Sequence, residues 1–157
     1  MAISNYERLI QLSDEVFSTR TDPDQLNVNE NVMEHLQLIH PDTLSEYDDG
    51  NGPVCWLLCI PTTLDLMTKF INKTISEREL YELTPLNTKY EAIYLCSALL
   101  LEEFRGKGIA QNLAIKAIES IRIDHPIEAL FFWSFSKEGE KLAEKVSRLI
   151  GLPLYKR

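Results

Sequence analysis

Cysteine and basic residues are scarce in this sequence of 157 residues, and each scarcity argues against a class of protein. The three cysteines, Cys55, Cys59 and Cys96, are an odd number without CxxC spacing, and no paired histidine or cysteine completes a zinc set. We interpret them as reduced, buried thiols and predict no metal. The 16 basic residues face 24 acidic ones, and the net charge of -8 repels nucleic acid over most of the surface.

Long apolar runs are missing as well. No segment approaches the roughly 18 uncharged apolar residues of a membrane span, and the start Met-Ala-Ile-Ser-Asn-Tyr-Glu has no basic stretch followed by an apolar core. We therefore expect a cytoplasmic protein without a membrane partner. Hydrophobic residues at 45% and charged ones at 25% are ordinary globular values, and the length suits a single domain over residues 1–157.

The stretch from Glu91 to Ile121 combines an apolar run, a glycine-bearing hexapeptide and an amphipathic pattern. Residues 92–101 carry no charge, which is typical of a strand that is buried on both faces. After the hexapeptide Arg105–Ala110, apolar residues recur at three- and four-residue spacing, which predicts one buried stripe on a helix. The predicted order is strand, glycine turn, helix.

Such a unit leaves the first backbone N–H groups of the helix without intrahelical partners. Gly106 and Gly108 would let a bulky ligand approach them, so the position suits a phosphate or pyrophosphate as well as a plain turn. Two known phosphate loops do not fit. Lys107 is followed by Gly108 instead of the Ser or Thr of the P-loop, and Gln111 stands where the dinucleotide fingerprint needs a third glycine.

The segment Glu-Glu-Phe-Arg-Gly-Lys-Gly-Ile-Ala, residues 102–110, resembles the cofactor motif of the GNAT acetyltransferase superfamily, Arg/Gln-x-x-Gly-x-Gly/Ala. Glu102 replaces a proline and Ala110 the last glycine of its familiar form. The resemblance implies acetyl-CoA as co-substrate, with its pyrophosphate on the motif amides and its pantetheine arm on the preceding strand end, which splays from its neighbour in the family. The implied cofactor-binding residues are Leu99, Leu100, Leu101, Arg105, Gly106, Lys107, Gly108, Ile109, Ala110 and, at the place of a family asparagine, Ser136.

The remaining elements follow from capping and turn signals. A helix capped by Ser4 and a second helix over about 29–40 precede a polar, turn-rich connection over 42–53. In the family, such a helical pair forms part of the acceptor wall, so His35 and His40 either face the acceptor or are surface or helix-end histidines.

A strand over 54–60 then leads into two short helices, the first capped by Thr62 or Thr63 and the second by the capping box of Ser76. Most family members have a simple hairpin there, so these helices are an insertion. A strand over 129–133 and a helix capped by Ser136 follow, and residues 152–157 stand where the family usually adds two strands. We predict an α/β fold, a GNAT-like mixed central sheet flanked by helices, with a helical insertion after the first clear strand and a shortened C-terminus.

Acyl transfer to an amine needs an uncharged nitrogen, so a base or a water chain must remove a proton, and an acid can protonate the leaving thiolate. The tyrosine that serves as acid in many members has no counterpart here, and the candidates that replace it are Tyr155 and Ser147, each of which can equally be a surface or packing residue. Glu91 adjoins the position where some members place a glutamate base. Tyr94 and Ser97 on the same strand could instead hold a water.

The leading interpretation is an enzyme, an N-acetyltransferase that moves acetyl from acetyl-CoA to a small amine or a protein amine by direct attack, with no metal. Two alternatives remain. One is a non-catalytic acyl-CoA-binding or interaction module with the same fold, and the other is an α/β domain that keeps its glycines for the turn alone. The inserted helices could shape a substrate pocket or the contact of a homodimer.

Overall fold

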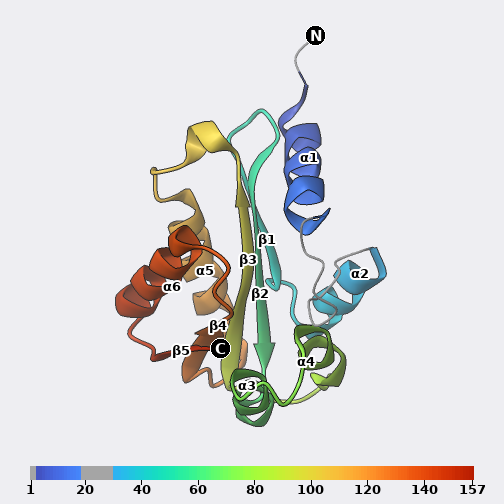
Figure 1. Cartoon of the computed structure of the whole chain (residues 1–157), viewed down its shortest axis with the longest axis vertical. Coiled ribbons are helices and arrows are strands. Elements are labelled where there is room, and N and C mark those ends of the chain that lie inside the picture. The colour runs from blue at the N-terminus through green and yellow to red at the C-terminus, as the bar shows by residue number, and fades with distance from the viewer. Residues whose placement is uncertain (1–2, 19–29) are drawn as a thin grey trace.

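The computed structural model describes residues 3–18 and 30–157, and it is organised around one mixed five-stranded sheet (Figure 1). The strands lie side by side in chain order. The first three strands are antiparallel to one another in succession, and the third, fourth and fifth are parallel to one another. Their bounds are β1 (Leu44–Asp48), β2 (Pro53–Thr62), β3 (Ala92–Leu100), β4 (Ala129–Phe132) and β5 (Leu154–Lys156).

Helices cover both faces of the sheet, which confirms the predicted α/β class. In Figure 1, α5 and α6 lie on one side of the strands, α1 and α2 lie on the other, and α3 and α4 lie near one end of β2. The bounds are α1 (Asn5–Ser18), α2 (Glu30–Ile39), α3 (Leu64–Ile71), α4 (Glu77–Leu83), the short 3-10 helix η1 (Glu102–Phe104), α5 (Ile109–Asp124) and α6 (Lys137–Ile150). Among these described helices, none is long and apolar enough to cross a membrane.

The predicted helical insertion between β2 and β3 is confirmed, together with its caps. Thr63 Oγ1 accepts a hydrogen bond from Leu66 N at 3.3 Å, so Thr63, and not Thr62, is the N-cap of α3. Ser76 Oγ accepts from Glu79 N at 3.0 Å while the Glu79 carboxylate accepts from Ser76 N at 3.1 Å, which is the reciprocal capping box. The insertion therefore has a defined place against the sheet.

The predicted turn-rich connection over 42–53 is wrong in one respect, because it contains the edge strand β1. Residues 44–48 pair with β2 although Glu46 and Asp48 are charged. Acidic side chains are compatible with an edge strand, because only one of its two edges must be paired and its outer positions face water. The turn itself is confirmed at Asp48, whose carboxylate accepts from Gly50 N at 2.7 Å and Gly52 N at 3.1 Å.

Both histidines near the end of α2 make contacts within the fold. His40 is only 4% exposed, its Nε2 donates to the Asp124 carboxylate at 2.7 Å, and its Nδ1 accepts from Asp42 N at 3.0 Å. These bonds fasten the end of α2 to the last turn of α5. His35 packs edge-on against Tyr81 of α4, with ring centroids 5.0 Å apart.

The end of α5 is also fastened to the segment before β3. His125 Nδ1 accepts from Tyr90 N at 3.2 Å, and the two rings lie 4.6 Å apart. Burial is the main cause that lowers the pKa of His125, followed by repulsion from the His40 and Lys89 charges.

Strand β3 is longer than its pairing with β4. The parallel register runs from Ala92 opposite Ala129 to Tyr94 opposite Phe131 and ends there. On its other side β3 stays paired with β2 as far as Leu100, with a register shift that leaves Cys96 as the extra residue of a β-bulge. The second half of β3 therefore has β2 on one edge and no β4 partner on the other.

Candidate functional site

The segment between β3 and α5 places two glycines in the left-handed region. Gly106 has φ +78° and Gly108 has φ +77°, and a Cβ at Gly106 would meet no atom within 4 Å. Gly108 is the N-cap of α5, yet no side chain caps the helix. The first intrahelical bond runs from Asn112 N to Gly108 O at 2.9 Å, so the amides of residues 109–111 precede it. This helix start has the geometry that suits an anion.

Positive charge flanks the same segment. Arg105 and Lys107 are both exposed, and Lys107 Nζ lies 5.4 Å from the centre of the Phe104 ring. The helix dipole adds to their potential at the first turn of α5. Residues 105–107 thus form an exposed, cationic turn, and the segment becomes buried at Ala110, in the first turn of α5.

An ion pair connects α1 to η1, the 3-10 helix that precedes this turn. Both guanidinium nitrogens at the end of Arg8, in α1, bond to the Glu103 carboxylate of η1, one of them at 2.7 Å. The bond to Arg8 is the main cause that lowers the pKa of Glu103 to about 2. Because bidentate pairs fix orientation, Arg8 positions η1 and with it the start of the glycine segment.

The main chain at the end of β3 offers bonding groups on the side away from β2. Leu101 N donates to Val54 O at 3.0 Å, so in the antiparallel ladder the groups of Leu99 and Leu101 are directed at β2. The backbone N–H and C=O groups of Ala98 and Leu100 then point to the opposite edge of β3, where β4 is no longer paired. Of the three leucines predicted to bond the pantetheine arm, Leu100 has the required direction, and the contact itself stays a prediction.

A buried carboxylate lies against β3 where the pairing with β4 ends. Glu77 of α4 is only 1% exposed, and its Oε2 accepts a hydrogen bond from the Tyr94 hydroxyl. The thiol of the bulged Cys96 lies 3.9 Å from the same oxygen. Tyr94 is itself the last residue of β3 that pairs with β4. The inserted helix α4 thus places the Glu77 carboxyl group beside Tyr94, where the pairing of β3 with β4 ends.

The sequence-predicted catalytic residues do not meet at this point. Tyr155 is 45% exposed on β5, which β4 separates from β3 by two strand spacings, or roughly 10 Å. Glu91 immediately precedes β3. Its backbone bonds to Thr62 and Glu128, at the end of β3 where both β2 and β4 are paired with it. Ser136 caps α6 by accepting from Gly139 N at 3.0 Å.

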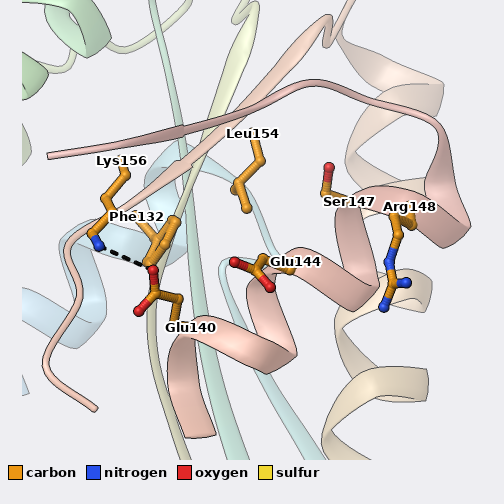
Figure 2. Close-up of a pocket in the computed structure, with 7 residues that line it drawn as sticks. All are labelled: Phe132, Glu140, Glu144, Ser147, Arg148, Leu154 and Lys156. Atoms are coloured by element: carbon orange, nitrogen blue, oxygen red, sulfur yellow. Dashed lines mark hydrogen bonds and ion pairs between the residues drawn. The ribbon is translucent and has the colours of Figure 1, made fainter. Parts of the chain in front are cut away.

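Ser147 lines a different hollow of about 540 Å³, shown in Figure 2. Its hydroxyl donates to Leu152 O at 2.6 Å, which fastens the end of α6 to the chain before β5. The hollow lies between α6 and the last two strands, and an ion pair from Lys156 to Glu140 at 3.0 Å crosses it. None of its lining residues belongs to β3 or to the segment 105–110. Ser147 therefore lies apart from β3, and a role of Ser147 or Tyr155 in proton transfer stays a prediction of the sequence.

The three cysteines are free and buried, as predicted. Burial raises the pKa of Cys59 to about 12 and that of Cys55 to about 11. Both therefore stay protonated near neutral pH and are poor nucleophiles and poor metal ligands. Among the described residues, no three His, Cys, Asp or Glu side chains are grouped to hold a metal ion.

Comparison with protein-family models and with curated proteins finds no match for the chain. Among solved structures, the chain is similar to an aminoglycoside acetyltransferase, meta-AAC0020, from an uncultured soil metagenomic sample. The trehalose complex has 14% identity and a TM-score of 0.49, and the sisomicin complex 15% and 0.47. Each match covers 94% of this chain and 83% of the other.

A tetramutant of the BH1408 protein from Bacillus halodurans is similar at 14% identity, with a TM-score of 0.49 and coverage of 94% of this chain and 87% of that one. Similarity at this level assigns no activity to the chain. Any function must therefore be argued from the residues at the divergence of β3 and β4 and at the start of α5.

Proposed function

We propose that the protein is an N-acetyltransferase that transfers acetyl from acetyl-CoA to a primary amine by direct attack. The observation that carries the proposal is the adjacency of two features along one strand. The second half of β3 lacks a β4 partner, and it leads through η1 directly into the uncapped glycine start of α5. A pantetheine arm needs an open strand edge, and a pyrophosphate needs unbonded amides at its end.

The residues of the glycine segment would bind the diphosphate. The amides of Ile109 and Ala110 would donate to its oxygens, and the left-handed Gly106 and Gly108 let those oxygens approach without a Cβ in the way. Leu100 and Ala98 would bond the amide groups of the pantetheine arm. When bound, acetyl-CoA supplies the thioester, and the remaining chemistry is a proton removed from the acceptor and a charge stabilised on the carbonyl oxygen.

Glu77 is the best-placed base for that proton. It lies at the divergence of β3 and β4, and its contact with the Tyr94 hydroxyl holds its orientation. An acceptor enters as an ammonium ion and gives one proton to the Glu77 carboxylate. The amine, which keeps two protons, would then form the C–N bond as the C–S bond of the thioester breaks. One of its two protons would pass to the leaving thiolate to give the CoA thiol, the other would stay on the amide nitrogen, and the proton on Glu77 would return to the solvent. Glu91, Tyr155 and Ser147 stay the candidates that the sequence predicts.

The test is release of CoA thiol from acetyl-CoA in the presence of an amine panel: a polyamine, an aminoglycoside, free amino acids and a lysine peptide. The panel spans the open identity of the acceptor. Amine-dependent thiol release with formation of the acetylated amine would support the proposal. The protein without any amine and the Gly108→Trp variant with every amine serve as controls.

The alternative of a non-catalytic acyl-CoA-binding module makes a different prediction in the same assay. It predicts acetyl-CoA binding with only slow thiol release that no amine accelerates. A domain that keeps its glycines for the turn alone predicts no binding at all. Cytoplasmic location and a homodimer stay predictions of the sequence.

A further inference from the structure

Arg157 holds its guanidinium in a corner of two aromatic rings. The guanidinium carbon lies 4.5 Å from the centre of the Phe70 ring and 4.4 Å from that of Trp133. The two rings stand almost perpendicular, at 79°. Backbone bonding fixes the residue as well, because Arg157 N donates to Phe132 O at 3.0 Å. The cation is therefore immobilised from two sides and through its own main chain.

One donor of this cation has no acceptor. Arg157 Nη1 is buried, and no described residue forms a hydrogen bond with it. Because the two rings are almost perpendicular, the planar guanidinium can stack on only one of them. Its N–H edge has the geometry that matches the two oxygens of a carboxylate. A buried donor without an acceptor is destabilising, so a methionine side chain, which has no donor, would serve packing alone at less cost. The arrangement is typical of a guanidinium that awaits an oxyanion.

Arg157 lies beside the proposed base. Phe70 contacts both Arg157 and the Tyr94 ring, the two ring centroids lying 5.0 Å apart, and the Tyr94 hydroxyl donates to Glu77. Trp133 follows β4 immediately beyond its paired residues, so it borders the point where β3 and β4 part. Arg157 is thus connected to Glu77 through two aromatic residues in contact, Phe70 and Tyr94.

We propose that Arg157 binds a carboxylate of the acceptor, so that the acceptor is an amine of the amino-acid type. This inference rests on the proposed acetyltransferase function and names its substrate class. Glu77 would meet the ammonium end of the acceptor and Arg157 its carboxylate end. Apolar parts of the acceptor would pack on Phe70 and Trp133.

The experiment compares acceptors that differ only in the carboxylate, namely L-lysine with cadaverine and L-phenylalanine with phenethylamine. A third pair, phosphoethanolamine and ethanolamine, tests phosphate as the oxyanion. For each pair, kcat and KM of acetyl transfer and the Kd of the acceptor for the CoA-loaded protein are measured. We expect the carboxylated member to have a KM lower by tenfold or more, and Arg157→Gln to bring that ratio close to one. The control variant Arg148→Gln, at an exposed arginine of α6, should leave the ratio unchanged.

Arg157→Lys serves if the glutamine variant does not fold, because it keeps the charge but lacks the two-pronged edge, and its ratio should fall between the other two. Equal KM and Kd within each pair for the wild-type protein, or a preference that survives Arg157→Gln, would overturn the inference. So would a preference for phosphoethanolamine alone, or no binding of any pair to the CoA-loaded protein. Failure to bind acetyl-CoA would instead contradict the proposed function, and the two failures are separate measurements.

Discussion

A matched set of glycine substitutions separates the backbone role of the glycine segment from its binding role. Gly106, Gly108 and Gly151 have φ values of +78°, +77° and +76°. A Cβ would meet nothing within 4 Å at Gly106 and Gly151, and only Asn112 Nδ2 at 3.8 Å at Gly108. Alanine at any of the three therefore meets the same backbone strain and no steric clash. Gly151 ends α6, away from the proposed cofactor segment, and is the control.

The expected stability loss is the same for all three variants. An L-residue in the left-handed region costs about 1–2 kcal/mol. For a domain of this size, each kcal/mol lowers Tm by roughly 2–4 °C. Gly106→Ala, Gly108→Ala and Gly151→Ala should thus each lower Tm by a few degrees, measured by calorimetry.

The affinity for acetyl-CoA should distinguish the two variants of the glycine segment from Gly151→Ala. A methyl group at position 106 or 108 would keep phosphate oxygens from the amides of α5, and one charge-assisted hydrogen bond contributes about 1.5–3 kcal/mol. Gly106→Ala and Gly108→Ala should therefore weaken binding about tenfold or more, while Gly151→Ala keeps the wild-type Kd. Equal Kd values for all three variants would refute the assignment of the diphosphate to this turn.

Three further predictions concern charged groups. Glu77→Gln should lower kcat of amine acetylation by roughly 10²- to 10⁴-fold with the acetyl-CoA Kd unchanged, and an unchanged kcat would remove Glu77 as the base. The Arg8–Glu103 pair keeps the pKa of Glu103 near 2, so its stabilisation is present above about pH 4.5 and is lost as pH falls toward 2. Acid unfolding of Arg8→Gln should show a flatter dependence over that range, and an identical curve would contradict it. The lowered pKa of His125 means that the unfolded chain takes up the proton first, so stability should fall as pH drops through 6.5. Urea midpoints at pH 7.5 and 5.5 test this, and His125→Gln should reduce their difference.

Much of the fold follows from local sequence signals. The uncharged run before the glycines predicted β3 to within one residue of its end, and the capping residues Ser76 and Ser136 predicted the starts of α4 and α6. These signals are local, because a cap or a run of apolar residues is satisfied within a few positions of chain. The edge strand β1 was missed because three of its five residues are exposed and none is buried, so its pairing with β2 is the main evidence for it.

The candidate site could be predicted only where it is contiguous in sequence. The segment from Arg105 to Ala110 is one turn of chain, and its geometry follows from its two glycines. Glu77 was missed because an acidic residue in the first turn of a helix is common and needs no further explanation. Its spacing of three from the buried Leu80 was the available signal, since it puts the carboxylate on the apolar stripe. Ser147 and Tyr155 were predicted from their places relative to Gly151 in the family pattern, which says nothing of how far either lies from β3.

The most direct test of the central claim is calorimetric titration of the purified protein with acetyl-CoA, with ATP and NAD as control ligands and Gly108→Trp as the blocked variant. The account predicts saturable binding of acetyl-CoA that the tryptophan variant loses, with weaker or absent binding of ATP and NAD. Absence of acetyl-CoA binding to the wild-type protein, or equal binding to the Gly108→Trp variant, would contradict it.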